Sequence, residues 1–358
     1  MTEELLSRQA LNRSLLARQH LLQRRALPLP LAMEQVGGLQ TQYAPAGYVG
    51  LWSRLEGLTR DALTRALFDR SVVQGTLMRS TIHMVSATDY WRFARGITKG
   101  RRAWFLRTHA RTAGGIDMHA VARVIRGLLA DGPSRRSELV GALDEAGFPA
   151  VAWSGAGLWV DMVRVPPSGT WERRRADLYG LAEAWVSPDD AAGAADAPSG
   201  ENGAASVHLV RRYLGGFGPA TLNDIAGWAG LKAGDLRLAA PALGLRRYRD
   251  EEGRELLDLP DAPLPDPATP APVRFLPVWD ATLLVHARRT QILPEEFRSR
   301  VFHTKNPQSV NTFLVDGSVA GSWRYERGQI VLDPFRTIPR TLRRELDAEA
   351  ERLAAFHA

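Results

Sequence analysis

The 358-residue sequence contains no cysteine, and this absence excludes disulfide bonds, thiolate metal sites and a cysteine nucleophile. It also lacks an apolar run of 18 residues, and its first residues, Met1-Thr2-Glu3-Glu4, show no signal-peptide pattern. We therefore expect a cytoplasmic protein with no membrane partner. Lysine is scarce, since only Lys99, Lys232 and Lys305 stand among the 46 Lys and Arg residues.

Recognisable metal and nucleotide motifs are also missing from the sequence. Gly155-Ala156-Gly157 lacks the third glycine of a dinucleotide-binding loop, and no Gly-Lys-Ser/Thr phosphate loop is present. The histidines form neither an i,i+4 pair nor a His-Glu-x-x-His cluster. We expect no metal and no cofactor. The eight histidines are His20, His83, His109, His119, His208, His286, His303 and His357.

The charge balance is basic and comes almost entirely from arginine. The formal net charge is +7 and the sequence pI is about 10.1. Such a balance favours polyanionic partners, which are nucleic acid or an anionic membrane surface. Guanidinium groups suit phosphates and guanine edges because they present a fork of donors.

The most distinctive short segment is Gly37-Gly38-Leu39-Gln40-Thr41-Gln42-Tyr43-Ala44-Pro45. The glycine pair and Pro45 disfavour a helix, so an extended or turning segment is predicted. Residues i and i+2 of an extended segment point the same way, which would place the amides of Gln40 and Gln42 side by side. Such a pair can hold a water, read a base edge or bind backbone, although an ordinary surface turn has the same composition.

The order of predicted elements, three helices and then a hairpin, is typical of a winged helix and recurs along the chain. In the first copy, an amphipathic helix with a basic face is expected in residues 4–25. Thr59 is expected to cap a helix over 60–69, and a hairpin is expected around Gly75. In the second copy, residues 164–175 are expected to form a basic ribbon that turns at Ser168-Gly169 and is able to touch phosphate.

We predict an α+β fold of three tandem winged-helix units and a C-terminal β-rich domain, arranged around a basic cleft. From its length alone, the chain is expected to form two or three domains. The predicted divisions are winged-helix unit 1 with the Gln-x-Gln motif (1–115), winged-helix unit 2 (116–187), a flexible linker or loop (188–204), winged-helix unit 3 (205–258), a Pro-rich spacer (259–272) and the β-rich domain with hairpins and a terminal helix (273–358).

Two basic segments are candidate DNA contacts. Arg101 and Arg102 belong to a basic run with interleaved aromatics, which can equally be a solvated helix face. A polar tip that follows Arg298 and Arg300 contains His303 and Lys305. This tip could enter a groove as a β-ribbon, or it could be an ordinary exposed hairpin.

Several segments together resemble the bacterial AlkZ/YcaQ-like family of tandem winged-helix DNA glycosylases, and the resemblance covers most of the chain. One branch of that family carries a Gln-aliphatic-Gln motif and the other carries Gln-x-Asp. This chain has Gln42 as in the first branch, whereas its central Thr41 is not aliphatic. The segments that carry the resemblance are Leu39-Gln40-Thr41-Gln42, Gly50-Leu51-Trp52-Ser53-Arg54-Leu55, Leu77-Met78-Arg79-Ser80-Thr81-Ile82-His83, residues 275–284 and residues 314–324.

The resemblance implies hydrolysis of the N-glycosidic bond of N7-alkylated purines. In one branch it also implies the unhooking of interstrand crosslinks made by DNA-alkylating antibiotics, which is a self-resistance function. Gln42 is expected to orient the attacking water and Gln40 to support it, or the reverse. Because no lysine adjoins the motif, hydrolysis without strand cleavage is expected. Arg54 and Arg79, which lie in the matching segments, join the candidate DNA contacts.

Two other readings remain open from the sequence. A winged-helix transcription regulator would bind a preferred operator and leave DNA intact, but it would usually be a dimer, and no heptad dimerisation helix is evident. A nucleoid-associated binding protein would bind DNA with strong salt sensitivity and no activity. We expect a monomer whose partner is double-stranded DNA with alkylated or crosslinked purines, acting at the nucleoid.

Overall fold

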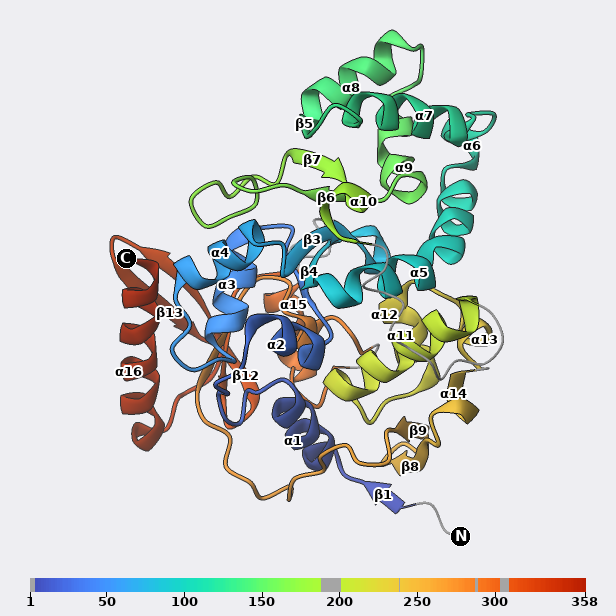
Figure 1. The fold of residues 1–358 in the computed structure, drawn as a ribbon. Coiled ribbons are helices and arrows are strands. Elements are labelled where there is room, and N and C mark those ends of the chain that lie inside the picture. The colour runs from blue at the N-terminus through green and yellow to red at the C-terminus, as the bar shows by residue number, and fades with distance from the viewer. Residues whose placement is uncertain (1–3, 188–200, 238, 287–288, 303–308) are drawn as a thin grey trace.

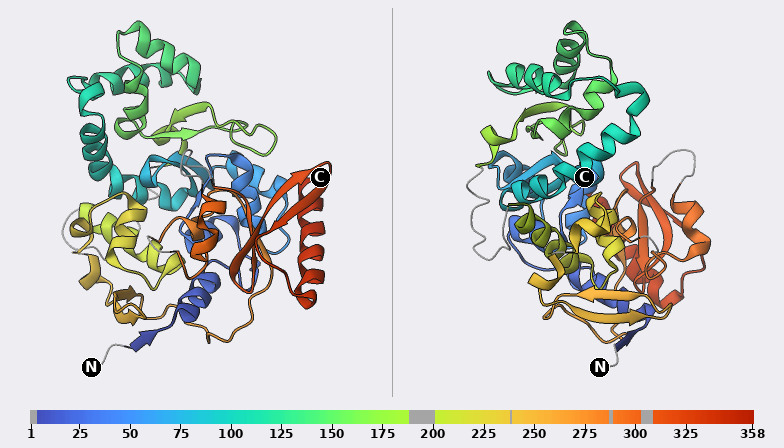
Figure 2. Two further views of the ribbon diagram at one scale, coloured as in Figure 1. Left: turned by 180° about the vertical axis from the view of Figure 1, so that it is seen from behind. Right: turned by 90° about the vertical axis from the view of Figure 1, so that its right-hand side faces the viewer.

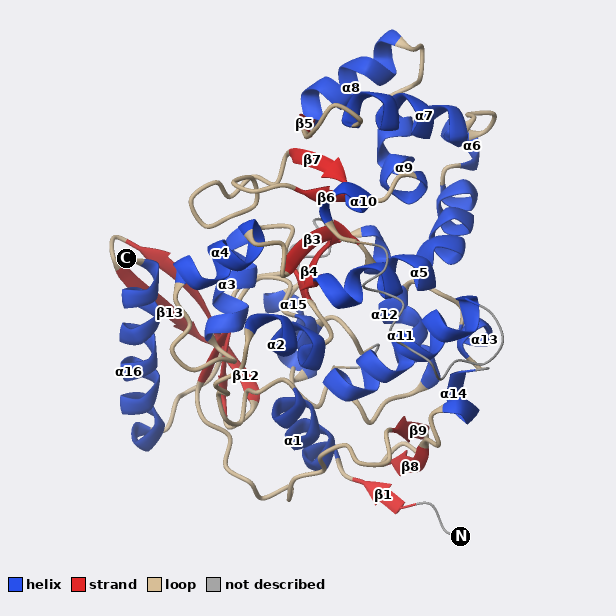
Figure 3. Ribbon diagram, in the orientation of Figure 1, coloured by secondary structure: helices blue, strands red, loops and turns tan. Residues whose placement is uncertain are grey.

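The computed structural model describes residues 4–187, 201–237, 239–286, 289–302 and 309–358 and has a mixed α+β fold (Figures 1 and 3). The predicted α+β class is confirmed. The number of winged-helix units, their boundaries and the basic cleft stay predictions. Among the described residues, no helix is long and apolar enough to cross a membrane.

A six-stranded sheet with the strand order β2-β4-β3-β6-β7-β5 lies at the centre of the molecule. The pairing of β3 with β6, which aligns Gln74 with Arg164, joins the strands of the first two predicted units into one sheet. The strands are β2 (Leu39–Gln40), β3 (Val72–Thr76), β4 (Ile82–Ser86), β5 (Ser134–Arg135), β6 (Met162–Arg164) and β7 (Leu178–Leu181).

Helices α7 and α8 of the second predicted unit lie beyond β7, whereas α3 and α4 of the first unit lie on the other side of the sheet (Figures 1 and 2). Helices α7, α8 and α9 share a hydrophobic core with β7, and this core includes Ile125 and Leu139. The helices are α1 (Arg8–Arg18), α2 (Leu29–Val36), α3 (Ala44–Trp52), α4 (Arg60–Phe68), α5 (Ala87–Thr108), α6 (Ala110–Ala113), α7 (Met118–Leu129), α8 (Arg136–Glu145), α9 (Val151–Trp159) and α10 (Ala182–Trp185).

The third predicted unit packs against α5 and α2 through the long helix α11. Leu209 and Tyr213 of α11 share a core with Phe93 of α5. A small sheet in the order β1-β8-β9 closes this part, and β1 pairs with β8 in parallel. The elements are α11 (Glu201–Phe217), α12 (Leu222–Ala229), α13 (Ala233–Leu236), α14 (Ala239–Ala242), β1 (Glu4–Leu6), β8 (Arg246–Asp250) and β9 (Glu255–Asp258).

The C-terminal part is an antiparallel sheet in the order β10-β11-β12-β13, with α16 along one side (Figure 2). Phe275 and Phe313 of this sheet share a core with Tyr48 of α3 and Leu353 of α16. The elements are β10 (Arg274–Leu276), η3 (Ala281–Leu283), η4 (Glu295–Phe297), α15 (Arg298–Val301), β11 (Thr312–Val315), β12 (Ser318–Glu326), β13 (Gln329–Pro334) and α16 (Arg340–His357).

Several local predictions are confirmed because their signals are local. The Thr59 hydroxyl accepts a hydrogen bond from the Ala62 amide at the start of α4. The dipeptide Asp316-Gly317 predicts a two-residue hairpin turn, and both residues, with positive φ, form the turn between β11 and β12. The sequence also predicts a hairpin over 245–257 with Gly253 in its turn, and β8 and β9 form it.

One predicted hairpin is confirmed with its turn further along the chain, and three other local predictions are wrong in part or whole. The hairpin expected around Gly75 is formed by β3 and β4, which turn at residues 77–81, while Gly75 lies within β3 against Tyr90. The helix expected in residues 4–25 is present only as α1, and Arg13 and Arg18 point inward instead of forming an exposed basic face. Residues 281–285, whose apolar sequence predicts a strand, begin with a 3₁₀ turn instead. Residues 201–204 of the predicted linker belong to α11, and residues 188–200 lie outside the described part.

Candidate active site

The Gln-x-Gln motif lies at the edge of the central sheet, where β2 ends. The backbone of Gln40 pairs with His83 on β4, and the Thr41 amide donates to the Ile82 carbonyl at 2.8 Å. The chain then turns and enters α3, which has Pro45 in its first turn. The short strand therefore fixes Gln40, and the turn presents Gln42 to solvent.

The two glutamine side chains lie side by side, as the extended spacing predicts. Gln40 Nε2 donates to Gln42 Oε1 at 2.8 Å. Gln40 is buried, with 8% of its surface exposed, whereas Gln42 is exposed. The outer amide thus keeps its NH₂ group and one oxygen lone pair available for a ligand or water.

Arg79 holds the inner amide from the other side. Its Nη2 donates to Gln40 Oε1 at 2.9 Å, and its Nη1 donates to the Trp228 carbonyl at 3.2 Å in the last turn of α12. Arg79 has a left-handed φ of 52° in the turn between β3 and β4. Burial lowers the pKa of Arg79, which nevertheless stays protonated as arginine does in proteins.

The imidazole of His83, beside the motif, is uncharged at neutral pH. Burial, and next the charge of Arg79, lower the pKa of His83 to about 3. Its Nδ1 lies 3.1 Å from the Thr81 carbonyl, which assigns the N–H to Nδ1. Among the described residues, neither glutamine hydrogen bonds to a carboxylate or a lysine. The chemistry available at the motif is therefore that of neutral amides.

Arg54 is not placed to contact DNA, contrary to the prediction. Its side chain is fully buried, and it donates to both carboxylate oxygens of Asp280 at 2.9 Å. It also donates to Gln19 Oε1 at 3.0 and 3.2 Å. The sequence could not show this, because a buried ion pair needs a partner 226 residues away.

The other predicted arginines fall into two groups. Arg101 is buried and donates to the Thr76 carbonyl, while Arg102 is half-buried and donates to the Leu158 carbonyl at 2.7 Å. Both hydrogen bonds brace α5 against its neighbours. The prediction of a DNA contact is therefore wrong for the buried Arg101, and for the half-buried Arg102 it stays a prediction. Arg298 and Arg300 are exposed, in ion pairs of 3.3 Å with Glu295 and Asp333.

The predicted contacts His303 and Lys305 lie outside the described residues. They stay predictions.

A basic loop between β6 and β7 approaches the motif. Residues 165–177 project over α3 and α4 (Figure 1), and Arg174 Nη1 donates to the Tyr43 hydroxyl at 3.1 Å. Tyr43 follows Gln42 and is 42% exposed. The sequence indicated a ribbon able to touch phosphate here, but Tyr43 was not among the predicted site residues.

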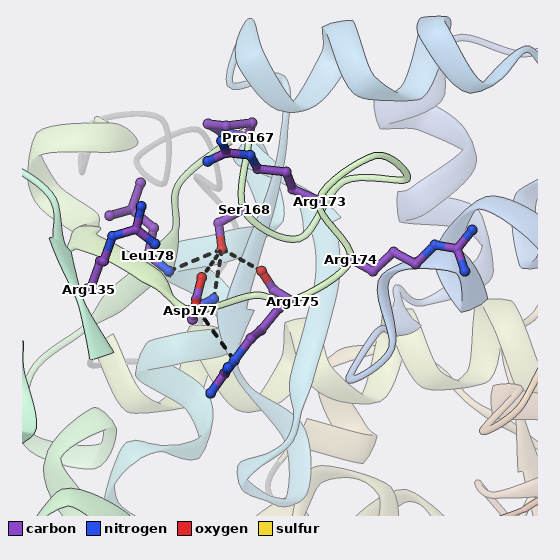
Figure 4. A pocket seen from close by; sticks show the side chains of 8 residues that line it. All are labelled: Arg135, Pro167, Ser168, Arg173, Arg174, Arg175, Asp177 and Leu178. Carbon is purple, nitrogen blue, oxygen red and sulfur yellow. Dashed lines mark hydrogen bonds and ion pairs between the residues drawn. The ribbon is translucent and has the colours of Figure 1, made fainter. Parts of the chain in front are cut away.

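The buried hydroxyl of Ser168 holds this loop in shape (Figure 4). The hydroxyl accepts hydrogen bonds from the Asp177 and Leu178 amides at 2.7 and 3.1 Å, and it donates one to the Arg175 carbonyl at 2.8 Å. The Gly169 carbonyl accepts from Gln74 at 2.8 Å. A hollow of about 380 Å³ beside the loop is lined by Arg135, Pro167, Ser168, Arg173, Arg174, Arg175, Asp177 and Leu178.

The remaining motif segments hold these parts together. Ser53 donates to the Phe275 carbonyl, and this bond and the pair of Arg54 and Asp280 fasten the end of α3 to the C-terminal part. Within that part, Trp323 Nε1 donates to the Leu276 carbonyl at 3.0 Å. The segments that carry the family resemblance are therefore connected to one another through hydrogen bonds.

Comparison with known proteins identifies the family. The model of the family described as "DNA glycosylase AlkZ-like" matches residues 33–356. The chain belongs to the AlkZ-like DNA glycosylase family. The match includes both glutamines, Arg79 and the β6–β7 loop.

The fold of this AlkZ-like protein is also that of a solved glycosylase. The structure of Streptomyces sahachiroi DNA glycosylase AlkZ matches it with a TM-score of 0.80 and 20% sequence identity, over 98% of this chain and 97% of that chain. No curated protein sequence matches the chain. Membership of the AlkZ-like family favours a DNA glycosylase over the regulator and the nucleoid protein considered from the sequence.

Proposed function

We propose that this AlkZ-like glycosylase hydrolyses the N-glycosidic bond of N7-alkylated purines in double-stranded DNA, including purines joined by an interstrand crosslink. The observation that carries the proposal is the exposed amide of Gln42, held by Gln40 in a site whose nearest histidine is neutral. Within the described residues, the two amides and the neutral His83 offer hydrogen bonds rather than a charged general acid. Such a site suits a base that departs without being protonated.

An N7-alkylated guanine meets this requirement because it already carries a positive charge. The bond between C1′ and N9 breaks with its electron pair going to the base, which leaves neutral. A water oxygen forms the new bond to C1′, and the water loses a proton to solvent. We infer that Gln42 Oε1 accepts a hydrogen bond from this water, which turns the water oxygen towards C1′.

The absence of a lysine bonded to either glutamine, within the described residues, supports direct hydrolysis. A Schiff-base mechanism would need an amine at C1′ and would lead to strand cleavage. We therefore propose a monofunctional enzyme that leaves an intact abasic strand. The open position of Gln42 supports a site that reaches a bulky lesion without drawing it into a closed pocket.

DNA is proposed to dock on the β6–β7 loop as well as at the motif. Arg173, Arg174 and Arg175 are exposed, and the hydrogen bonds of Ser168 keep their backbone in one conformation. A rigid loop loses little conformational entropy when its arginines bind phosphates. Because Arg174 touches Tyr43, a phosphate on the loop would bring the duplex next to Gln42. We propose that the protein acts as a monomer.

The test is incubation with duplex DNA that contains one N7-methylguanine, followed by gel analysis with and without hot alkali. Cleavage only after alkali is expected for the wild type. Gln42→Ala should lower the single-turnover rate by on the order of 100-fold while duplex binding stays the same. A matched duplex with an N7–N7 crosslink tests the crosslink substrate separately. Intact DNA from every alkylated duplex would contradict the proposed function.

A further inference from the structure

The hydrogen bonds at the motif have one possible direction. An arginine side chain has donors and no acceptor, so the atom of Gln40 that faces Arg79 must be its oxygen. The NH₂ group of Gln40 then faces Gln42, and the atom of Gln42 that receives it must be its oxygen. Amide orientation is usually ambiguous, but here Arg79 determines both amides in series.

Arg79 is itself held in a single orientation. Its Nη1 binds the Trp228 carbonyl, which is one of the carbonyls left without a helical partner at the end of α12. Gly230 ends that helix with a φ of 73°, a conformation that favours glycine, and it lies beside the Arg79 backbone. Both terminal nitrogens of the guanidinium are thus engaged within the protein.

We propose that Arg79 is a positioning residue that sets the orientation of the Gln42 amide through Gln40. The proposal rests on the proposed glycosylase function. Arg79 contacts Gln40 and not the reacting atoms, so its effect reaches the water only through the two amides. Hydrogen bonds in such a chain also polarise one another, which strengthens the hold on Gln42. Arg79 therefore differs from the DNA contact that the sequence indicated.

The first experiment separates positioning from DNA binding. Arg79→Ala should lower the single-turnover rate on the N7-methylguanine duplex by on the order of 100-fold. The dissociation constant for undamaged duplex and its salt dependence should not change. Arg79→Lys should recover part of the rate, because an ammonium can still donate to Gln40. A phosphate contact predicts the opposite pattern, with weaker binding and a salt slope reduced by about 0.9.

The second experiment tests the coupling with Gln40. If Arg79 acts through that amide, adding Arg79→Ala to a Gln40→Ala variant should lower the single-turnover rate by less than about threefold. If the rate of the double variant instead falls by the product of the two single losses, the proposal is overturned. An inactive wild type would instead contradict the glycosylase function, so the two failures are distinguishable.

The third experiment keeps Arg79 and removes the donor of the hydrogen bond from Gln40 to Gln42. It covers the case in which Arg79→Ala does not fold. Gln40→Glu still accepts from Arg79 but cannot donate to Gln42. The Gln42 amide must then turn over, which moves its oxygen away from the water. The rate should fall as far as it does in Gln40→Ala, with circular dichroism showing a folded protein. A folded Gln40→Glu variant with the wild-type rate would overturn the proposal.

Discussion

The guanidinium of Arg54 and the carboxylate of Asp280 form a two-bond ion pair with both side chains fully buried. Arg54 lies just after α3, and Asp280 caps the 3₁₀ turn that follows β10. The pair therefore joins the helix after the Gln-x-Gln motif to the C-terminal sheet. Gln19 binds the same guanidinium and also donates to the Val36 and Gly216 carbonyls, which extends the connection to α2 and α11.

Breaking this pair should destabilise the fold strongly. Arg54→Met leaves the Asp280 carboxylate buried without its partner, and removing one member of a buried pair costs about 3–5 kcal/mol. Denaturant unfolding measures the change. The exposed pair of Arg298 and Glu295 is the control, because Arg298→Ala should cost at most about 1 kcal/mol. Equal costs for the two variants would contradict the structural role of Arg54.

The β6–β7 loop should account for part of the salt dependence of DNA binding. Each phosphate contact contributes about 0.9 to the slope of log K against log salt. Arg173→Ala and Arg175→Ala should each reduce the slope by about that amount, measured by fluorescence anisotropy with undamaged duplex. Arg247→Ala is the control, since Arg247 lies on β8 in an exposed pair with Glu255, away from the loop. An unchanged slope in both loop variants would place the duplex elsewhere.

The buried His83 should make the fold sensitive to acid. Its pKa is about 3 in the folded protein, where burial and then Arg79 disfavour the charged form, against about 6.5 when unfolded. The contribution of neutral, buried His83 to the free energy of unfolding is complete above pH 6.5. It falls as the pH drops below 6.5 and is lost by about pH 3. The cost is about 1.4 kcal/mol per pH unit within that window.

Replacing this histidine tests the assignment. In His83→Gln, the free energy of unfolding should fall less steeply between pH 6 and pH 4 than in the wild type. The difference in slope should be about 1.4 kcal/mol per pH unit, which corresponds to one proton taken up on unfolding. His119→Gln is the control, because His119 is exposed on α7. The same slope in wild type and His83→Gln would show that His83 is not buried and neutral as the structure has it.

The parts that the sequence predicted well depend on neighbouring residues. Caps such as Thr59 and the turn at Asp316-Gly317 follow from a few adjacent side chains and their backbone preferences. The pairing of Gln40 and Gln42 follows from the period of an extended strand. These features need no knowledge of the rest of the chain.

Which arginines are buried and which are exposed could not be predicted, because burial depends on partners that are distant in sequence. Arg18 appeared to be part of a solvated basic face, yet it forms a fully buried pair with Asp258 on β9. Arg79 appeared to be a DNA contact, and its Gln40 partner is 39 residues away. A surface arginine and a buried one have the same local sequence signal, so only the fold separates them.

Gln40 and Gln42 should differ in their tolerance of a carboxylate, because the hydrogen-bond chain runs in one direction. In Gln42→Glu, one carboxylate oxygen still accepts from Gln40 Nε2, and the other can accept from the water. This variant should keep its rate within about tenfold of wild type at neutral pH. It should also lose activity below about pH 4.3, where a carboxyl becomes protonated, whereas an amide does not titrate. Single-turnover rates between pH 4 and pH 8 on the N7-methylguanine duplex measure both effects, with Gln42→Ala as the control that has no hydrogen-bonding group. If Gln42→Glu is as slow as Gln42→Ala across this range, the Gln42 oxygen is not the group that orients the water.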